Sequence, residues 1–525
     1  MKQTFVLILI SITFSCSSIK FNNEFLTSSN TTLNIDFDEI QLKNWYNLDL
    51  EQDSIPGMSV ERAYNELIKD IKPKKVIVAV IDAGIDIYHE DLKDVIWLNK
   101  GEIPNNKIDD DNNGYIDDIN GWNFLGESYD ETLEITRLIR DDKTDNPQYK
   151  DALNIFNGKV SDAKKDLDFY RPILENYKTA SDIIKKHLKV ESFEIDDIKN
   201  INSKDMFVSK SKEFLLYSNS VELDLDRLEG LVGQFSDYVN YYYNVDFNGR
   251  EIVGDDIYNL EDLNYGDPNV VHSKNSESHG THVSGIIGGN RSNGIGMKGI
   301  NNDIELMAIR AVPNGDEYDK DISLAIRYAV DNGAKIINMS FGKSFSSNPE
   351  WVYNAIKYAE KKNVLIVHAA GNDDKNLDEY DDKNFPNDHK YINEFVENYI
   401  SVGASTINYN KDLIAYFSNY GQRNVDIYAP GYQIYSTTPN DNYDFKNGTS
   451  MAAPSVTGVA SLILSYFPKI SAKRLKEIIL ESGIDFNFSV NHDDKDILFE
   501  NLSKSGKIVN AYNALILASG KKINK

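Results

Sequence analysis

The chain has 525 residues, and its 82 acidic side chains outnumber its 56 basic ones, which gives a formal net charge of −26 at pH 7. Apolar residues make up 41% of the sequence, which is enough to build a sizeable core and excludes a globally disordered chain. The acidic balance argues against nucleic-acid binding and against a polybasic membrane patch, because both need a basic surface.

The amino terminus has the pattern of an export signal. Lys2 precedes an apolar run over residues 5–14, and small residues follow around Cys16. The run is too short to span a bilayer in a mature protein, so residues 1–16 are predicted to be a signal peptide. Cys16 is the only cysteine, which excludes an internal disulfide, and it lies where a bacterial lipoprotein carries its lipidated cysteine, although Thr13 replaces the usual Leu. We expect an exported lipoprotein, anchored to a membrane of a bacterial cell envelope only through this lipid; the alternative is an ordinary cleaved signal and a secreted protein.

Residues 17–44 are rich in Asn, Ser and Thr and are predicted to be a polar tether. Beyond them, short apolar runs alternate with helix-like stretches. The predicted strands are residues 76–81, 304–309, 335–339, 364–369 and 399–402, and the predicted helices include residues 322–331 and 351–361. Continuous apolar strands that alternate with helices are typical of βαβ units. The fold class we expect is therefore α/β, with a doubly wound, mostly parallel sheet whose functional residues gather at the carboxyl ends of the strands.

Residues 141–249 break this alternation. The segment is highly charged, has few strand-like runs, and carries apolar residues at roughly helical spacing. We interpret it as a mainly helical insertion in a domain formed by residues 45–140 and 250–520. We expect the insertion near the rim of the cleft at these strand ends, where it would limit the size of what enters, recruit a partner or have no role.

Three short segments carry candidate catalytic side chains. Asp82 ends the first buried strand, His279 opens a helix of small residues, and Ser450 opens another. Taken alone, such an Asp is usually a turn former and such a Ser is usually a helix N-cap. His279 and His282 lie three residues apart but lack the HExxH pattern and a third nearby ligand, so they do not predict a zinc site. Together, however, Asp, His and Ser follow the chain order of a subtilisin-type triad.

The surrounding residues strengthen this interpretation. The segments VIDAG (80–84), HGTHVSGI (279–286) and GTSMAAP (448–454) resemble the three signature blocks of subtilisin-like serine peptidases, and HAAGND (368–373) and NMSFG (338–342) agree with two further blocks. The resemblance covers roughly residues 45–140 and 250–520, but not the insertion. Ala83 departs from the family pattern, which usually has Ser or Thr after the triad Asp.

The resemblance implies a serine endopeptidase that acts on protein or peptide substrates through an acyl-enzyme. Ser450 would be the nucleophile, His279 its general base and Asp82 the residue that orients the imidazole. Asn372 and the Ser450 backbone N–H would stabilise the oxyanion. The residues expected to pair with the substrate backbone are Ser340, Phe341 and Gly342. His282 would have a structural role.

Two other functions are considered. A catalytically inactive relative that binds peptides would keep the fold and lose the reaction. An α/β-hydrolase esterase would need a G-x-S-x-G turn with the catalytic His last in the chain, whereas Ala452 stands two residues after Ser450 and His279 precedes it.

An acidic segment over residues 109–118 has the spacing of a Ca²⁺-binding loop. Alternate positions offer oxygen ligands, although the twelfth position is Asn120 rather than Glu, so this is not a complete EF-hand. Subtilisin-like peptidases commonly use Ca²⁺ to brace loops, so the resemblance implies a structural ion; the alternative is a hydrated acidic turn. The predicted ligands are Asp109, Asp111, Asn113, the Tyr115 carbonyl and Asp117.

Overall fold

The computed structural model describes residues 19–21, 23–26, 38–271, 278–379, 383–390, 393–492 and 495–521. The predicted signal peptide, including Cys16, lies outside these residues. Among the residues described, no helix has both the length and the apolar composition needed to cross a membrane.

Within the described residues, nine strands form the main sheet. Their spatial order is β12 (Ile484–Asp485), β15 (Lys507–Ile508), β9 (Ile427–Pro430), β8 (Tyr399–Ser405), β5 (Leu365–Ala369), β4 (Ile336–Met339), β1 (Val76–Asp82), β3 (Ile304–Arg310) and β2 (Gly121–Asn123). Every neighbouring pair is parallel except β12 and β15. The doubly wound, mostly parallel sheet expected from the sequence is therefore confirmed, and each of the five predicted strands is present.

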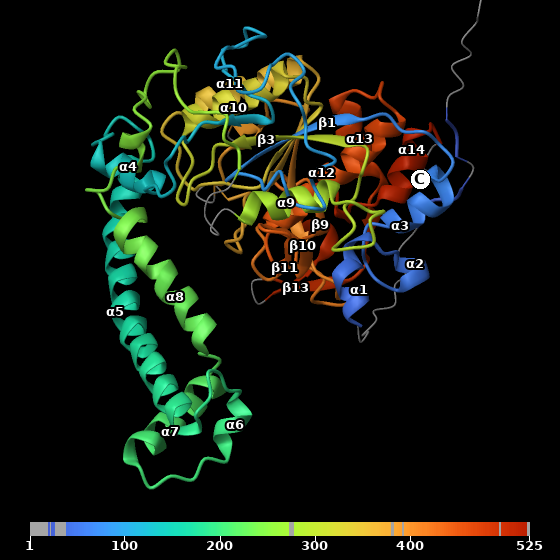
Figure 1. Cartoon of the computed structure of the whole chain (residues 1–525). Coiled ribbons are helices and arrows are strands. Elements are labelled where there is room, and N and C mark those ends of the chain that lie inside the picture. The colour runs from blue at the N-terminus through green and yellow to red at the C-terminus, as the bar shows by residue number, and fades with distance from the viewer. Residues whose placement is uncertain are drawn as a thin grey trace, which may run out of the picture.

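Both faces of the sheet are covered by helices (Figure 1). On one face, Val78 and Val80 of β1 share a core with α9 (Ser278–Gly288), α12 (Thr449–Tyr466), α13 (Ala472–Ser482) and α14 (Ala511–Ala518). On the other face, Ala79 and Ile81 share a core with α10 (Asp319–Asp331) and α11 (Pro349–Lys361). Successive side chains of a strand point to opposite faces, so a strand buried on both faces is apolar at every position.

Shorter elements surround this body. In the described part of the chain, three antiparallel strand pairs lie outside the main sheet: β6 (His389–Lys390) with β7 (Asn393–Glu394), β10 (Ile434–Thr438) with β11 (Asn442–Lys446), and β13 (Ser489–His492) with β14 (Lys495–Leu498). The amino-terminal helices are α1 (Glu39–Asn44), α2 (Leu50–Asp53) and α3 (Val60–Ala63).

Part of the predicted polar tether lies against the body. Phe21 and Leu26 are buried, and Leu26 exchanges two backbone hydrogen bonds with the Asn513 side chain of α14 (2.8 and 3.0 Å). Asp38 caps α1. The described residues of this segment are thus fixed to the domain that follows.

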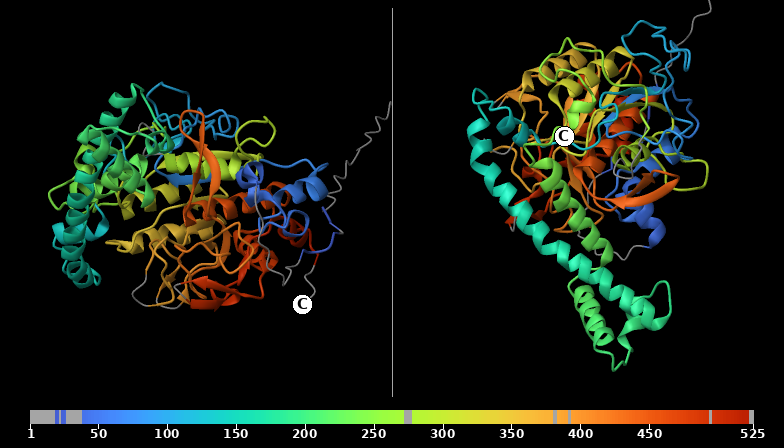
Figure 2. Two further views of the ribbon diagram at one scale, coloured as in Figure 1. Left: turned by 90° about the horizontal axis from the view of Figure 1, so that it is seen from below. Right: turned by 60° about the vertical axis from the view of Figure 1, so that its left-hand side comes forward.

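The insertion forms a helical arm. Figures 1 and 2 show α5 (Tyr149–Leu188) and α8 (Leu225–Asp237) side by side and directed away from the sheet, with α6 (Ile195–Lys199) and α7 (Met206–Ser220) at the tip. With 40 residues, α5 is about 60 Å long. The arm has a separate apolar core that includes Leu174, Ile184, Leu215 and Leu228. At its base lie α4 (Glu134–Arg140), η3 (Tyr238–Tyr242) and η4 (Gly249–Ile252).

Candidate active site

Asp82 and His279 meet at the carboxyl edge of the sheet. Asp82 ends β1 and is 2% exposed, whereas His279 lies in the first turn of α9 with its side chain 35% exposed. His279 Nδ1 is 2.9 and 3.0 Å from the two carboxylate oxygens of Asp82. A carboxylate can accept but not donate, so this contact places the imidazole proton on Nδ1 and leaves a lone pair on Nε2 of the neutral ring.

Gly280 makes this meeting possible. A Cβ atom at position 280 would lie 2.2 Å from the carbonyl oxygen of Gly84 and 3.0 Å from Cβ of Asp82. A side chain therefore does not fit between the start of α9 and the end of β1. The glycine that follows His279 lets the helix approach the strand closely enough for the imidazole to reach the carboxylate.

Ser450 lies in the first turn of α12 and contacts Ser340. Its hydroxyl donates to the Ser340 carbonyl oxygen (3.0 Å), and the Ser340 hydroxyl donates to the Ser450 carbonyl oxygen (2.9 Å). His279 and Ser340 line the same cavity of about 250 Å³. The Ser450 hydroxyl proton is directed at Ser340 here, so it would have to turn away from that carbonyl before His279 could accept it.

Asn372 follows β5 and is held by the residue that precedes the serine. Its Oδ1 accepts from the backbone N–H of Thr449 (2.8 Å) and from the Thr449 hydroxyl (2.9 Å). These bonds identify the other end of the amide as the Nδ2 donor. A Cβ atom built on Gly448 would be 3.5 Å from both Asn372 Nδ2 and the Ser450 backbone nitrogen, so the two donors lie on the same side of Gly448.

The predicted substrate-pairing residues leave the sheet at the end of β4. Ser340 is buried, Phe341 is half-buried and Gly342 is exposed. Asn338 Nδ2 donates to the Ser340 hydroxyl (2.9 Å), which fixes the start of this segment. Beyond it, the backbone of Lys343 pairs with that of Phe385.

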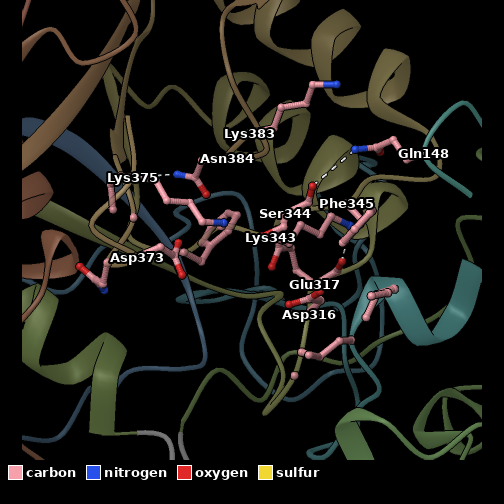
Figure 3. Close-up of a pocket in the computed structure, with 18 of the residues that line it drawn as sticks. Gln148, Asp316, Glu317, Lys343, Ser344, Phe345, Asp373, Lys375, Lys383 and Asn384 are labelled. Carbon is pink, nitrogen blue, oxygen red and sulfur yellow. Dashed lines mark hydrogen bonds between the residues drawn. The ribbon is translucent and has the colours of Figure 1, made fainter. Parts of the chain in front are cut away.

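A cavity of about 920 Å³ is lined by Ser450, Asn372 and residues 341–345. Figure 3 shows this cavity, with Lys343, Ser344 and Phe345 among its labelled lining residues. Its walls include Gly342, Gly371 and Asn384 near the serine, and Asp316 and Glu317 from the loop between β3 and α10. This volume lies at the upper end of the range found for ligand pockets in proteins. It is therefore large enough to hold several residues of an extended peptide.

Buried charged side chains connect the two walls of this cavity to α4. Arg137 donates to the carbonyl oxygens of Asp316 (2.9 Å) and Glu317 (3.1 Å), and Lys343 donates to the Glu317 carbonyl oxygen (2.7 Å). Burial alone would lower the pKa of Lys343, but Asp319 and Glu134 outweigh it and raise its pKa. Burial also raises the pKa of the Glu317 carboxyl to about 8, against the opposing charge of Lys343. The walls are thus held in place by Lys343 and by Arg137 of α4, the helix directly before the insertion.

His282 has a different environment from His279. It is fully buried, and its Nε2 is 3.0 and 3.1 Å from the carbonyl oxygens of Ile434 and Asp444. Burial lowers the pKa of His282 to about 3. The ring is therefore neutral at physiological pH and joins α9 to the β10–β11 hairpin, which supports the structural role expected for it.

The acidic loop gathers carboxylates in a somewhat different set from the predicted one. Ligand atoms of Glu102, Asp109 and Asp111 lie within 4.8 Å of one another. Asp117 instead accepts from the backbone N–H groups of Asn106 (3.2 Å) and Lys107 (2.9 Å). Three carboxylates this close repel one another, and a hard divalent cation with oxygen ligands would neutralise them, so the donor set fits Ca²⁺.

Several residues at these sites carry no recognisable signal in the sequence. Glu102 precedes the recognised loop spacing, and Lys343 follows the recognised NMSFG block. The insertion also contributes to the cavity, through side chains that include Gln148, Asp151 and Ile155. Their i, i+3 and i+7 spacing is that of one helix face, and the insertion is expected near the rim of the cleft, but the sequence does not show that this face lines the cavity.

The comparisons with known proteins agree with this geometry. Residues 73–502 match the model of the subtilase family. The chain is 35% identical to a cell wall-associated protease of Bacillus subtilis (strain 168) over 228 residues, which cover 43% of this chain and 23% of that protein. It is 36% identical to a thermophilic serine proteinase of Bacillus sp. (strain AK1) over 225 residues, 43% of this chain and 49% of the relative. It is 34% identical to the major intracellular serine protease of Bacillus subtilis (strain 168) over 221 residues, 42% of this chain and 64% of the relative. The matched segment thus spans less than two thirds of each of these relatives.

Proposed function

Because the chain belongs to the subtilase family, we propose that it is a serine endopeptidase that cleaves protein or peptide substrates through an acyl-enzyme on Ser450. The observation that carries the proposal is the contact of His279 Nδ1 with both oxygens of Asp82 (2.9 and 3.0 Å), next to the segment that Ser450 touches. A buried carboxylate that fixes an imidazole beside a serine is the arrangement that activates a hydroxyl for acyl transfer.

The reaction follows from these contacts. After rotation toward His279, the Ser450 hydroxyl attacks the scissile carbonyl carbon while Nε2 takes its proton. Asp82 stabilises the imidazolium that forms. His279 then gives the proton to the leaving amine, so the carbonyl-side product remains as an ester on Ser450 until water, activated in the same way, releases it.

Oxyanion stabilisation is assigned to two donors. Asn372 Nδ2 and the Ser450 backbone N–H lie on the same side of Gly448, and the second donor belongs to the first turn of α12. Unpaired N–H groups at a helix N-terminus carry partial positive charge. Together they would bind the negative oxygen of the tetrahedral intermediate more tightly than the carbonyl oxygen of the planar substrate.

The substrate is proposed to lie extended along Ser340, Phe341 and Gly342. The half-buried Phe341 and exposed Gly342 leave this backbone accessible, and the cavity of about 920 Å³ follows it. Backbone pairing gives affinity that is largely independent of sequence, so the target must present an unfolded segment or a loop.

Export and anchoring rest on the sequence pattern of residues 1–16. We propose that Cys16 is lipidated and holds the mature chain on a membrane of a bacterial cell envelope, the alternative being secretion. A Cys16→Ser chain would test this: release from the membrane fraction supports the anchor, and unchanged retention contradicts it.

A structural Ca²⁺ ion is proposed in the acidic loop. Asp109 and Asp111 of the predicted set, with Glu102 in addition, offer the carboxylates. Such an ion would neutralise the loop and brace it against the edge of the sheet. It lies outside the reaction described above.

Labelling with an organophosphonate distinguishes the enzyme from the alternative of an inactive peptide-binding protein. The proposal predicts one adduct, on Ser450, in the folded chain, and none in Ser450→Ala. A folded chain whose Ser450 does not react would favour the peptide-binding alternative.

A further inference from the structure

Basic side chains gather where the described amino terminus meets the carboxy-terminal helix. Four segments come together there: residues 19–26, 69–75, 467–470 and 519–521. They carry seven lysines against two carboxylates, Glu24 and Asp70, which gives a net charge of +5 in a chain whose total is −26. The lysines are Lys20, Lys69, Lys72, Lys74, Lys75, Lys469 and Lys521. The acidity of the whole chain therefore hides one surface of opposite charge, which we call the lysine face.

The amino-terminal segment is bonded to both carboxy-terminal segments of this face. The ring of Phe21 packs edge-on against that of Phe467, with centroids 6.2 Å apart. The Phe21 backbone N–H donates to the Ser519 hydroxyl (3.3 Å), and Lys521 donates to the Asn23 carbonyl oxygen (2.5 Å). Three segments that are far apart in the sequence are thus fixed to one another.

The segment before β1 joins the same surface. The Lys74 backbone N–H donates to the Ser465 carbonyl oxygen (2.8 Å), and Ser465 precedes Phe467 by two residues. Ile71 packs against the same apolar cluster as Phe467 and Phe21. The lysines on either side of Ile71 therefore lie beside those of the two termini.

The exposed lysines of this face have no internal counter-ion. Six of the seven are exposed, and in the part of the chain that the structure describes none of these six forms an ion pair. The seventh, Lys521, contacts Glu24 (3.2 Å). An exposed lysine elsewhere does have a partner, since Lys473 pairs with Glu397 (2.6 Å). Like charges held together without partners repel one another, so a negatively charged surface outside the protein would stabilise this face.

The lysine face lies next to the proposed lipid anchor. Cys16 is three residues from Ile19, where the described structure begins, so their Cα atoms are at most about 11 Å apart. Phe21 and Leu26 are buried against the body, which keeps Lys20 at this face. Charges at a surface act over roughly 8 Å at physiological salt. A lipid on Cys16 would therefore bring the lysine face into the electric field of the membrane that holds it.

We propose that the lysine face is a membrane-docking surface that binds anionic phospholipid headgroups beside the lipid anchor. The inference rests on the proposed lipidation of Cys16 and adds a second, electrostatic contact to it. A single acyl chain binds a bilayer only marginally and reversibly, and a basic patch next to it makes the attachment stable. Each lysine close to an anionic membrane surface strengthens binding about fivefold.

Docking of this face sets the orientation of the enzyme. Figures 1 and 2 show α14 and the amino-terminal helices on the side of the body opposite the arm. The cavity of about 920 Å³ is lined in part by α5, so it lies toward the arm. The cleft consequently faces away from the bilayer. The proposed substrates are then polypeptide segments in the surrounding water, and not segments within the membrane.

Vesicle binding of the mature chain without its lipid tests the inference. The chain comprises residues 16–525 with Cys16→Ser, and the vesicles contain either phosphatidylcholine alone or a mixture with anionic phosphatidylglycerol. One triple variant of this chain carries Lys20→Gln, Lys74→Gln and Lys469→Gln, from three segments of the lysine face.

The matched control replaces three lysines of the arm: Lys164→Gln, Lys204→Gln and Lys210→Gln. These lysines are also exposed, and none of them forms an ion pair within the described residues. The two triple variants have the same net charge, so a difference between them reports the place of the lysines and not their number. Thermal melts of both variants should match that of the unmodified chain.

The unmodified chain and the arm variant should bind vesicles that contain phosphatidylglycerol, should not bind phosphatidylcholine alone, and should be released by high salt. The variant of the lysine face should bind roughly 100-fold more weakly, because it lacks three lysines near the surface. Equal binding to both kinds of vesicle, or an equal loss in the two triple variants, would overturn the inference. Binding to soluble polyphosphate without binding to anionic vesicles would also overturn it, and would assign the face to an acidic polymer.

Failure of the anchor is seen in a different measurement. In a membrane fraction, high salt should release the Cys16→Ser chain but not the lipidated chain, because salt screens charges and does not remove an acyl chain from the bilayer. Release of both chains by salt, with vesicle binding as predicted above, would contradict the lipidation of Cys16 and support the lysine face. Neither measurement depends on peptidase activity.

Discussion

The close approach of α9 to β1 gives a sharp prediction for Gly280→Ala. The new methyl group would start 2.2 Å from the Gly84 carbonyl oxygen. Carbon–oxygen contacts in proteins lie near 3.3 Å or more, so the start of α9 has to move by about 1 Å. If this movement is directed away from the strand, the distance from His279 Nδ1 to Asp82 grows from 2.9 Å to roughly 4 Å, beyond hydrogen-bonding range.

The loss of this contact should affect catalysis more than folding. A misplacement of about 1 Å in a catalytic group costs on the order of 100-fold in rate. Overpacking of this kind typically costs about 1–3 kcal/mol of stability, which the chain can tolerate while remaining folded. We therefore expect kcat of Gly280→Ala to fall roughly 100-fold, with a modest decrease in Tm.

The assay is peptide hydrolysis together with a thermal melt, and Gly288→Ala is the control. Gly288 lies on the same helix, and its methyl would meet Cδ1 of Ile304 at 2.5 Å, the end of a side chain rather than backbone, and none of the three atoms nearest to that methyl belongs to Asp82. The control should keep its kcat. An unchanged kcat in Gly280→Ala, or an equal loss in both variants, would refute the role given to Gly280.

Three further predictions address other parts of the molecule. Asn372→Ala should lower kcat about 100- to 1,000-fold with little change in KM, because its amide would act mainly on the transition state; a change confined to KM would contradict this role. Chelation of divalent ions should lower Tm, and Asp109→Asn should make Tm insensitive to the chelator; a chain whose Tm never responds has no structural ion at this loop. Burial lowers the pKa of His368 from 6.5 to about 4. Between these pH values the unfolded chain binds more protons than the folded chain. The free energy of unfolding therefore falls as pH drops, by up to about 1.4 kcal/mol per pH unit. The decrease in Tm from pH 6.5 to 4.5 should therefore be smaller in His368→Asn, and an equal decrease would show that this group is not responsible.

Much of the fold could be predicted because its strands are buried on both faces. Runs such as residues 76–81 and 364–369 are apolar at nearly every position, which few other structures require. The short strands β2, β9, β12 and β15 could not be predicted, because two to four residues carry no readable period. The spacing of apolar residues in the insertion also predicts helices, but it does not predict the direction of the arm or the residues that attach it.

The candidate catalytic residues could be predicted from their sequence blocks, but the residues that surround them could not. Asp82, His279 and Ser450 stand in segments whose small residues and turns are specific enough to recognise. Three features depend on segments far apart in the chain: the contact of Ser450 with Ser340, the charged side chains around Lys343, and the residues of the insertion that line the cavity. Such long-range pairings leave no local pattern. The insertion was expected near the rim of the cleft, but only the structure shows which of its residues line the cavity.

The most direct measurement of the central claim is a mutant cycle on His279 and Ser450, read in kcat/KM. If the two side chains act as one catalytic unit, His279→Ala, Ser450→Ala and the double variant should all fall to the same residual rate, because removing either partner already disables the other. Losses that add on the free-energy scale, so that the double variant is far slower than either single one, would show that the imidazole and the hydroxyl act independently and would contradict the proposed relay.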